Sequence, residues 1–251
     1  MTPELVIIGI LTSGIRLATP YLYAAIGETF GQRSGVLNLG VDGQMLLGAF
    51  AAFYVAFTTG NLGLGLLAAV AVGALMGLAM AFITVNLQAE QGISGIGFYL
   101  FGLGMSELLF KMLLGTVETV KGFPSFHIPL LGDIPVIGEI FFQQNAMVYG
   151  AFLLVPVAWF VLNKTTLGLK IRSVGENPEA VGAWRPWGVL AGALLFSMVN
   201  SLQLWMQVLN IPIPSEIAVM LPYILTIVVL VATVSKVRSP SALTKPFDRG
   251  D

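Results

Sequence analysis

The chain has no cysteine, a single histidine and few charged residues. Without cysteine it has neither disulfide bonds nor a thiolate metal site, and one histidine excludes an H-E-x-x-H zinc motif. Only 10% of its 251 residues are charged, against about 25% in soluble domains, while 56% are hydrophobic. A net charge of -1 also excludes a nucleic-acid partner held by phosphate contacts. The composition therefore favours a protein whose surface lies largely in lipid.

Long apolar runs recur along the chain at the length of a membrane span, which takes about 20 residues to cross the bilayer core. The runs at 66–82 and 224–234 are continuous and do not alternate apolar with polar residues, so they predict helices and exclude a β-barrel. We predict an all-α, polytopic membrane protein forming one transmembrane domain over residues 1–251. The expected spans lie at about 5–26, 36–58, 62–85, 92–116, 146–163, 187–209 and 217–235. The first run lacks the basic residues of a cleavable signal peptide and is expected to be retained.

Basic residues predict how these spans are oriented. Nine of the twelve lysines and arginines fall in the loop 27–35, the loop 164–186 or the tail after residue 235. Such a bias marks the cytoplasmic side. We therefore expect the N-terminus outside, the C-terminus inside and the long loop 117–145 outside, in an inner or plasma membrane.

The sequence carries no motif for catalysis. The closest approach to a phosphate-binding loop, Asn163-Lys164-Thr165, has asparagine where the motif needs glycine. Gly102-Leu103-Gly104 lacks the third glycine of a dinucleotide fingerprint. We expect no enzyme activity, no catalytic residue, no metal and no cofactor.

Polar residues interrupt the start of the second predicted span. If this span begins near residue 36, Asp42 lies about 9 Å inside it, where a carboxylate costs about 2.5–3.5 kcal/mol. Asn38 precedes Asp42 by one helical turn, and Gln44 follows it. These three residues line a solute pathway near its cytoplasmic end, or Asp42 is a structural partner of another helix, with Arg16 in the first span as its candidate cation. A third interpretation places Asp42 at a shallow position at the membrane interface. The sequence leaves these interpretations open.

The loop 164–186 contains an amphipathic segment, 167–181, in which Leu167, Leu169 and Ile171 are apolar neighbours of basic residues. Within it Asn177 is placed to cap a helix that has Pro178 at its first position. The segment is an interfacial loop or a docking element for a cytoplasmic partner.

Three smaller patterns give further expectations. Glu107 and Lys111, one helical turn apart, predict a surface ion pair. Gly73 and Gly77 form a G-x-x-x-G pattern that permits close helix packing, although such a pattern arises easily among 29 glycines. His127 in the loop 117–145 is expected to be a solvated residue.

Two segments together resemble a known family. The run RSGVLNLGVDGQ at 33–44 resembles the signature near the start of the permeases of nucleoside and simple-sugar ABC importers, and the run SVGENP at 173–178 resembles their cytoplasmic coupling loop. The runs RPWG at 185–188 and LPY at 221–223 also match, and the variant at 28–45 is closer to the nucleoside branch. The resemblance implies a second permease subunit, a cytoplasmic ATPase and an external solute-binding lipoprotein as partners. It also implies the plasma (inner) membrane of a bacterium or archaeon. It assigns ATPase coupling to Gly175, Glu176, Asn177 and Pro178.

The sequence departs from this family after Val181. There the family continues with a further long helix and an external or re-entrant segment, whereas this chain reaches Arg185 almost at once. Two functions therefore stand: a permease subunit that transports nucleosides, or a non-transporting membrane component that still binds the partner subunits. A stand-alone channel or ion-coupled carrier is disfavoured, because ion coupling normally uses several intramembrane carboxylates and Asp42 is the single strong candidate.

Overall fold

The computed structural model describes residues 3–116, 118–175, 186–209, 211 and 215–233. Over these residues the chain is helical, and the one β interaction is an isolated antiparallel bridge between Ser125 and Asn145. The predicted all-α fold class is therefore confirmed. The described residues form two compact units. The first contains residues 3–29, the segment Phe123–Lys170 and the last two helices, and the second contains the segment Phe30–Gly122 and residues 171–175.

Six of the seven predicted spans coincide with helices that are long and apolar enough to cross a membrane. They are α1 (Pro3–Arg33), α2 (Val41–Thr59), α3 (Leu62–Ala81) with its π-helical continuation η1 (Phe82–Asn86), α4 (Gln91–Leu113), α6 (Ala146–Lys164) and α8 (Pro186–Val208). The seventh corresponds to α9 (Ser215–Thr233), whose apolar stretch Ile217–Val229 is shorter. The count of seven and the orientation remain predictions.

Side-chain caps start three of the spanning helices. The carboxamide oxygens of Asn61 and Asn145 accept backbone N–H groups at the starts of α3 and α6, and the carboxylate of Glu90 does the same for α4. Such caps satisfy N–H groups that have no acceptor within the helix. Helix α2 ends at Thr59 and is capped by Gly60, whose φ of 68° lies in the left-handed region that glycine adopts without strain.

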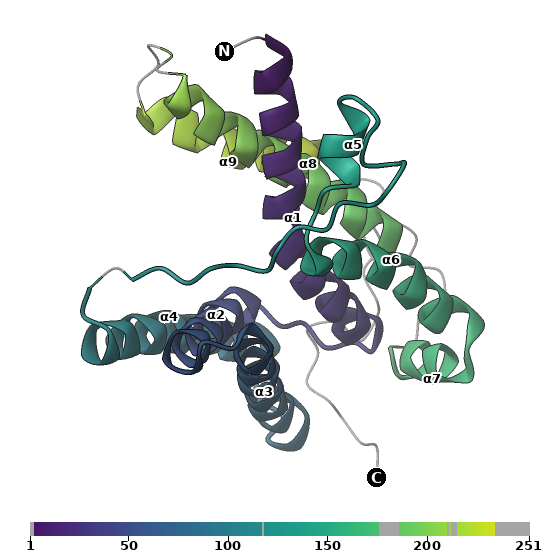
Figure 1. Ribbon diagram of the computed structural model, residues 1–251. Helices are drawn as coiled ribbons and strands as arrows, with labels where there is room; N and C mark the ends of the chain where they lie inside the picture. Colours follow the sequence, from purple (N-terminus) through teal and green to yellow (C-terminus); the bar gives the residue numbers. More distant parts are fainter. Residues whose placement is uncertain (1–2, 117, 176–185, 210, 212–214, 234–251) are drawn as a thin grey trace. The chain divides into compact units, whose positions relative to one another are not determined.

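In the second unit, α2 packs against both α3 and α4 (Figure 1). Gly95 lies against Leu39 and Gly102 against Gly43, so α2 and α4 run in the same direction. A Cβ at Gly102 would overlap the main chain of Gly43, so the two backbones are in direct contact. By contrast, nothing lies within contact distance of a Cβ built on Gly73 or Gly77, so that G-x-x-x-G pattern mediates no helix contact among the described residues.

In the first unit, α1 packs against α8 and α6. The Ser201 hydroxyl on α8 donates to the Ile10 carbonyl at 2.7 Å, and the Tyr23 hydroxyl donates to the Met147 carbonyl on α6 at 2.9 Å. Ile15 and Val148 belong to its apolar core. Polar bonds between helices supplement van der Waals contact where lipid provides no hydrophobic driving force.

The loop between α4 and α6 contains a short helix, α5 (Ile137–Phe141). Gln144, fully buried, donates from Nε2 to the Ile140 carbonyl at 2.7 Å. His127, expected to be merely solvated, has its Nε2 3.0 Å from Oδ1 of Asp133. Both side chains are exposed, so this pair adds little stability.

Candidate functional site

The signature segment forms a loop before α2, and this changes the position of Asp42. Helix α2 begins at Val41 and not near residue 36, because Asn38 Oδ1 accepts the Gly40 N–H at 2.9 Å and closes a turn there. Asp42 therefore lies in the first helical turn and is exposed. The expected depth of about 9 Å is wrong. At a helix N-terminus the carboxylate is stabilised by the helix dipole.

The structure brings together two of the three predicted pathway residues. The Asn38 amide donates to Gln44 Oε1 at 3.3 Å, and Gln44 Nε2 is buried without a hydrogen-bond partner in the described structure. Asp42 precedes Gln44 by two positions, which places the two side chains about 160° apart around α2. Asn38 and Gln44 thus form one polar pair, while Asp42 faces another side of the helix.

Arg16, the candidate partner of Asp42, has a different partner. Its Nε donates to Gln144 Oε1 at 2.9 Å, within the first unit. This bond joins α1 to the end of the loop before α6, and it gives the arginine a structural role that needs no carboxylate.

Sequence reasoning missed Gln91, which holds the signature loop. Its side chain is 3% exposed, and its Oε1 accepts the Leu37 N–H at 2.8 Å. Its Nε2 donates to the Gly35 carbonyl at 3.4 Å. Gln91 is the first residue of α4, so it ties this helix to the loop between α1 and α2. A glutamine at the start of a span gives no signal in the sequence that it is buried.

Gly175 connects the two segments that carried the family resemblance. It is buried, and a Cβ there would overlap the carbonyl oxygen of Arg33 and lie 3.4 Å from the Gly35 nitrogen. The start of the predicted coupling loop therefore contacts the start of the signature within the second unit. The other predicted coupling residues, Glu176, Asn177 and Pro178, lie outside the described residues.

The amphipathic segment is helical before it reaches those residues, as α7 (Thr166–Val174). Helical geometry places Leu167, Ile171 and Val174 on one face and Leu169 on the opposite face, so the apolar side is narrower than expected. A Cβ at Gly168 would overlap main-chain oxygens at the end of α6, so this glycine lets α7 lie directly against that end.

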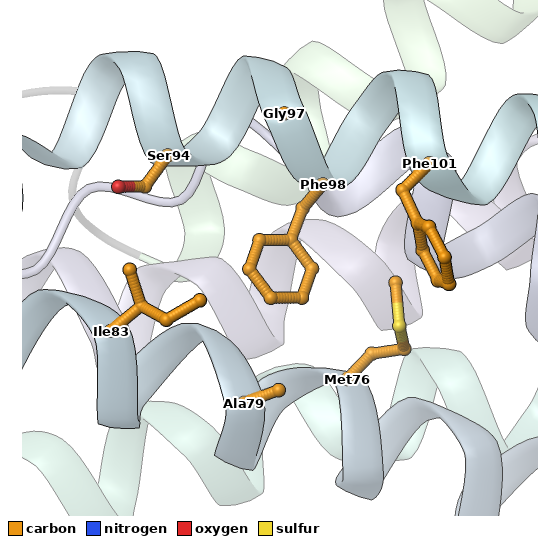
Figure 2. Close-up of a pocket in the computed structure, with 7 residues that line it drawn as sticks. All are labelled: Met76, Ala79, Ile83, Ser94, Gly97, Phe98 and Phe101. Carbon is orange, nitrogen blue, oxygen red and sulfur yellow. The ribbon is translucent and has the colours of Figure 1, made fainter.

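A cleft of about 500 Å³ lies between α3, η1 and α4. Figure 2 shows the rings of Phe98 and Phe101 on α4 directed towards the side of α3 that carries Met76 and Ala79. Its one polar side chain is Ser94, which donates to the Glu90 carbonyl. The cleft thus offers one hydroxyl group to a hydroxyl-rich solute, which needs several polar partners.

The comparison with family models decides the family. The model described as the permease component of branched-chain amino acid transport systems matches residues 10–184. The chain belongs to this family. The match includes both the signature and the coupling segment. The protein is therefore a multi-pass permease component of an ABC transporter in the plasma membrane, not an enzyme.

Curated relatives of this permease come from bacteria and an archaeon. A putative glucose ABC transporter permease of Haloferax volcanii is 32% identical, with 96% of this chain and 98% of the relative covered. A guanosine ABC transporter permease of Bacillus subtilis is 31% identical (93% and 94% covered), and a nucleoside ABC transporter permease of Lactococcus lactis is 29% identical (90% and 92%). These place the permease in the nucleoside and sugar class. No solved structure matches the chain.

The relatives match this permease over more residues than it contains, as expected if it lacks a segment after Val181. The matches extend over 324, 302 and 291 residues, more than the 251 of this permease. Each relative therefore contains residues that have no counterpart here. The family model ends its match at residue 184, close to the expected gap.

Proposed function

We propose that this permease forms the solute pathway of an ATP-driven importer for nucleosides, together with a second permease subunit. An ATPase docks on the predicted cytoplasmic face at Gly175, Glu176, Asn177 and Pro178, and an external lipoprotein delivers the solute. Similarity to the guanosine permease over more than nine-tenths of both chains supports the substrate class.

The observation that carries the coupling role is the contact of Gly175 with Arg33 and Gly35. Because Gln91 ties the same loop to α4, a displacement at the coupling segment has a packed route to α2 and α4. Coupling in proteins passes through such contiguous contacts when the elements have two arrangements.

The test is uptake of tritiated guanosine by proteoliposomes that contain the complex purified through a tag on this permease. We expect ATP-dependent uptake, and we expect Glu176→Ala and Asn177→Ala to reduce the amount of ATPase that copurifies. Lys121→Ala, a change on the predicted external side, is the control for the tag and the purification. Full recovery of the ATPase with both coupling variants would remove the docking role.

Asp42 remains a proposed pathway residue together with Asn38 and Gln44. Its exposed position in the first turn of α2 means that Asp42→Asn removes no buried ion pair. We therefore expect the variant to assemble normally and to change guanosine uptake. Normal uptake by an assembled Asp42→Asn complex would exclude this role.

A second function, a non-transporting component that binds the partner subunits, is favoured by the residues that the relatives have and this permease lacks. The same assay separates the two. A complex that retains ATPase and partner permease but takes up no nucleoside or glucose would establish the second function.

A further inference from the structure

A second cleft, of about 400 Å³, lies between α2 and α4 and is lined differently from the first. We name it the α2–α4 recess. Its main lining residues are three aromatic side chains, two carboxylates and one hydroxyl: Phe50, Phe53, Phe110, Glu107, Glu118 and Ser106. All of them belong to the second unit. The volume falls in the range of small-molecule sites, about 300–1,000 Å³.

The recess lies on the same face of α2 as Asp42. Residues seven and eleven positions after Asp42 return to within about 20° of its direction on a helix, and these are Ala49 and Phe53, both of which line the recess. Asp42 and Ala49 are exposed and Phe53 is partly exposed, whereas other faces of α2 contact α3 and α4. One open face of α2 therefore runs from the proposed pathway carboxylate to the recess, about 16 Å along the helix axis.

The position along α4 places the recess near one membrane surface. Glu107 lies about 24 Å from the start of α4, and Glu118 follows the end of the helix. In the predicted orientation this is the external side, where an importer receives its solute. Carboxylates at this level reach water, which they could not do at the centre of a bilayer.

The ion pair predicted from the sequence belongs to this site. The Lys111 ammonium donates to Glu107 Oε1 at 2.6 Å, and both side chains are well exposed. A carboxylate offers about four acceptor positions on its two oxygens, so Glu107 can accept further hydrogen bonds while it is paired. Glu118 and Glu107 thus place hydrogen-bond acceptors beside the phenylalanine rings that line the recess.

We propose that the α2–α4 recess binds nucleosides, with the phenylalanine rings against the planar base and the two carboxylates accepting hydrogen bonds from the ribose hydroxyls. The proposal rests on the function proposed above and assigns residues to it. Flat π-faces and hydroxyl donors occur together in a nucleoside, whereas a free sugar offers no base to stack. Aromatic stacking with a base is tolerant of base identity, since every base has a π-face.

The test uses the complete complex in proteoliposomes and tritiated guanosine, measured as equilibrium binding and as ATP-dependent uptake. We expect Phe53→Ala to weaken guanosine binding about tenfold, as loss of a base–aromatic stack does, and Phe53→Tyr to retain it. We expect Glu118→Gln to weaken binding too, because an amide is a poorer acceptor than a carboxylate. Phe82→Ala and Glu139→Gln change exposed residues of the same types outside the recess and should bind as the unmodified complex does. Photolabelling with tritiated 8-azidoguanosine should mark peptides that contain Phe53 or Phe110.

The possible results separate this site from the function on which it rests. If the unmodified complex binds and transports guanosine and both recess variants do so equally well, the site is wrong and the function stands. If the unmodified complex neither binds nor transports guanosine, the proposed function fails and the site with it. If glucose or choline displaces guanosine as effectively as inosine does, the recess recognises sugars or organic cations, and recognition by base stacking is wrong.

Discussion

Gln91→Met tests whether one buried glutamine holds the signature loop in place. Methionine preserves the length and approximate volume of the side chain, so packing changes little while both hydrogen bonds are lost. The Leu37 N–H then loses its acceptor, and this bond is partly buried because Gln91 itself is 3% exposed. A buried donor without a partner costs about 1–3 kcal/mol. The bond to Gly35, at 3.4 Å, is long and adds little.

A loss of about 2 kcal/mol should lower the melting temperature by about 4–8 °C in a chain of this length. The assay is thermal unfolding of the purified complex in detergent. Gln207→Met makes the same chemical change at an exposed position of α8 and should leave the melting temperature unchanged. If Gln91→Met melts with the unmodified complex, the hydrogen bonds to the loop do not stabilise it. If Gln91→Met melts at a lower temperature but keeps the ratio of guanosine uptake to ATP hydrolysis of the unmodified complex, Gln91 has no part in coupling.

Three further predictions follow from packing, orientation and capping. Gly102→Ala should destabilise the complex by about 1–3 kcal/mol, because the new methyl group would overlap the main chain of Gly43. Gly104→Ala has open space around it and should leave the stability unchanged. Thermal unfolding in detergent compares the two variants, and equal melting temperatures would contradict the contact. Ser125→Cys should react with an impermeant thiol reagent on intact cells and Thr166→Cys should not; the reverse pattern would invert the topology. The N–H groups of Ile93 and Gly92 hold the pKa of Glu90 below its ordinary value. The cap therefore stabilises the fold fully above the ordinary carboxyl pKa and weakens as the pH falls through the lowered value, so Glu90→Gln should flatten the acid side of a plot of melting temperature against pH.

The positions of the spans were predictable from the sequence because they depend on local properties. A helix in lipid satisfies its own backbone hydrogen bonds and needs a fixed number of apolar residues, and both conditions can be seen in a stretch of about 20 residues. The predicted spans at 62–85 and 146–163 lie within one or two residues of the helices observed there. The pair Glu107–Lys111 was predictable for the same reason, since it needs one helical turn alone.

The contacts of the signature segment were decided by tertiary structure. The sequence placed Asp42 inside a span, but the Asn38 turn delays the helix, and Gln91 from another helix holds the loop that precedes it. Arg16 donates to Gln144, 128 positions away, a partner that charge alone does not suggest. Neither partner could be chosen from sequence, because each bond depends on which helix lies alongside.

The glycines show most clearly which contacts the sequence predicts and which contacts depend on tertiary structure. The sequence alone identifies Gly73 and Gly77 as a candidate packing pair by their spacing, and it gives no sign that Gly43 contacts Gly102. The structure leaves the first pair open and places the second in backbone contact, because α2 and α4 run side by side in the same direction. The sequence by itself thus determined the class, six of the spans and, through the signature, the family. Tertiary structure decided which residues share a site, because helices distant in the sequence meet only when the chain is folded.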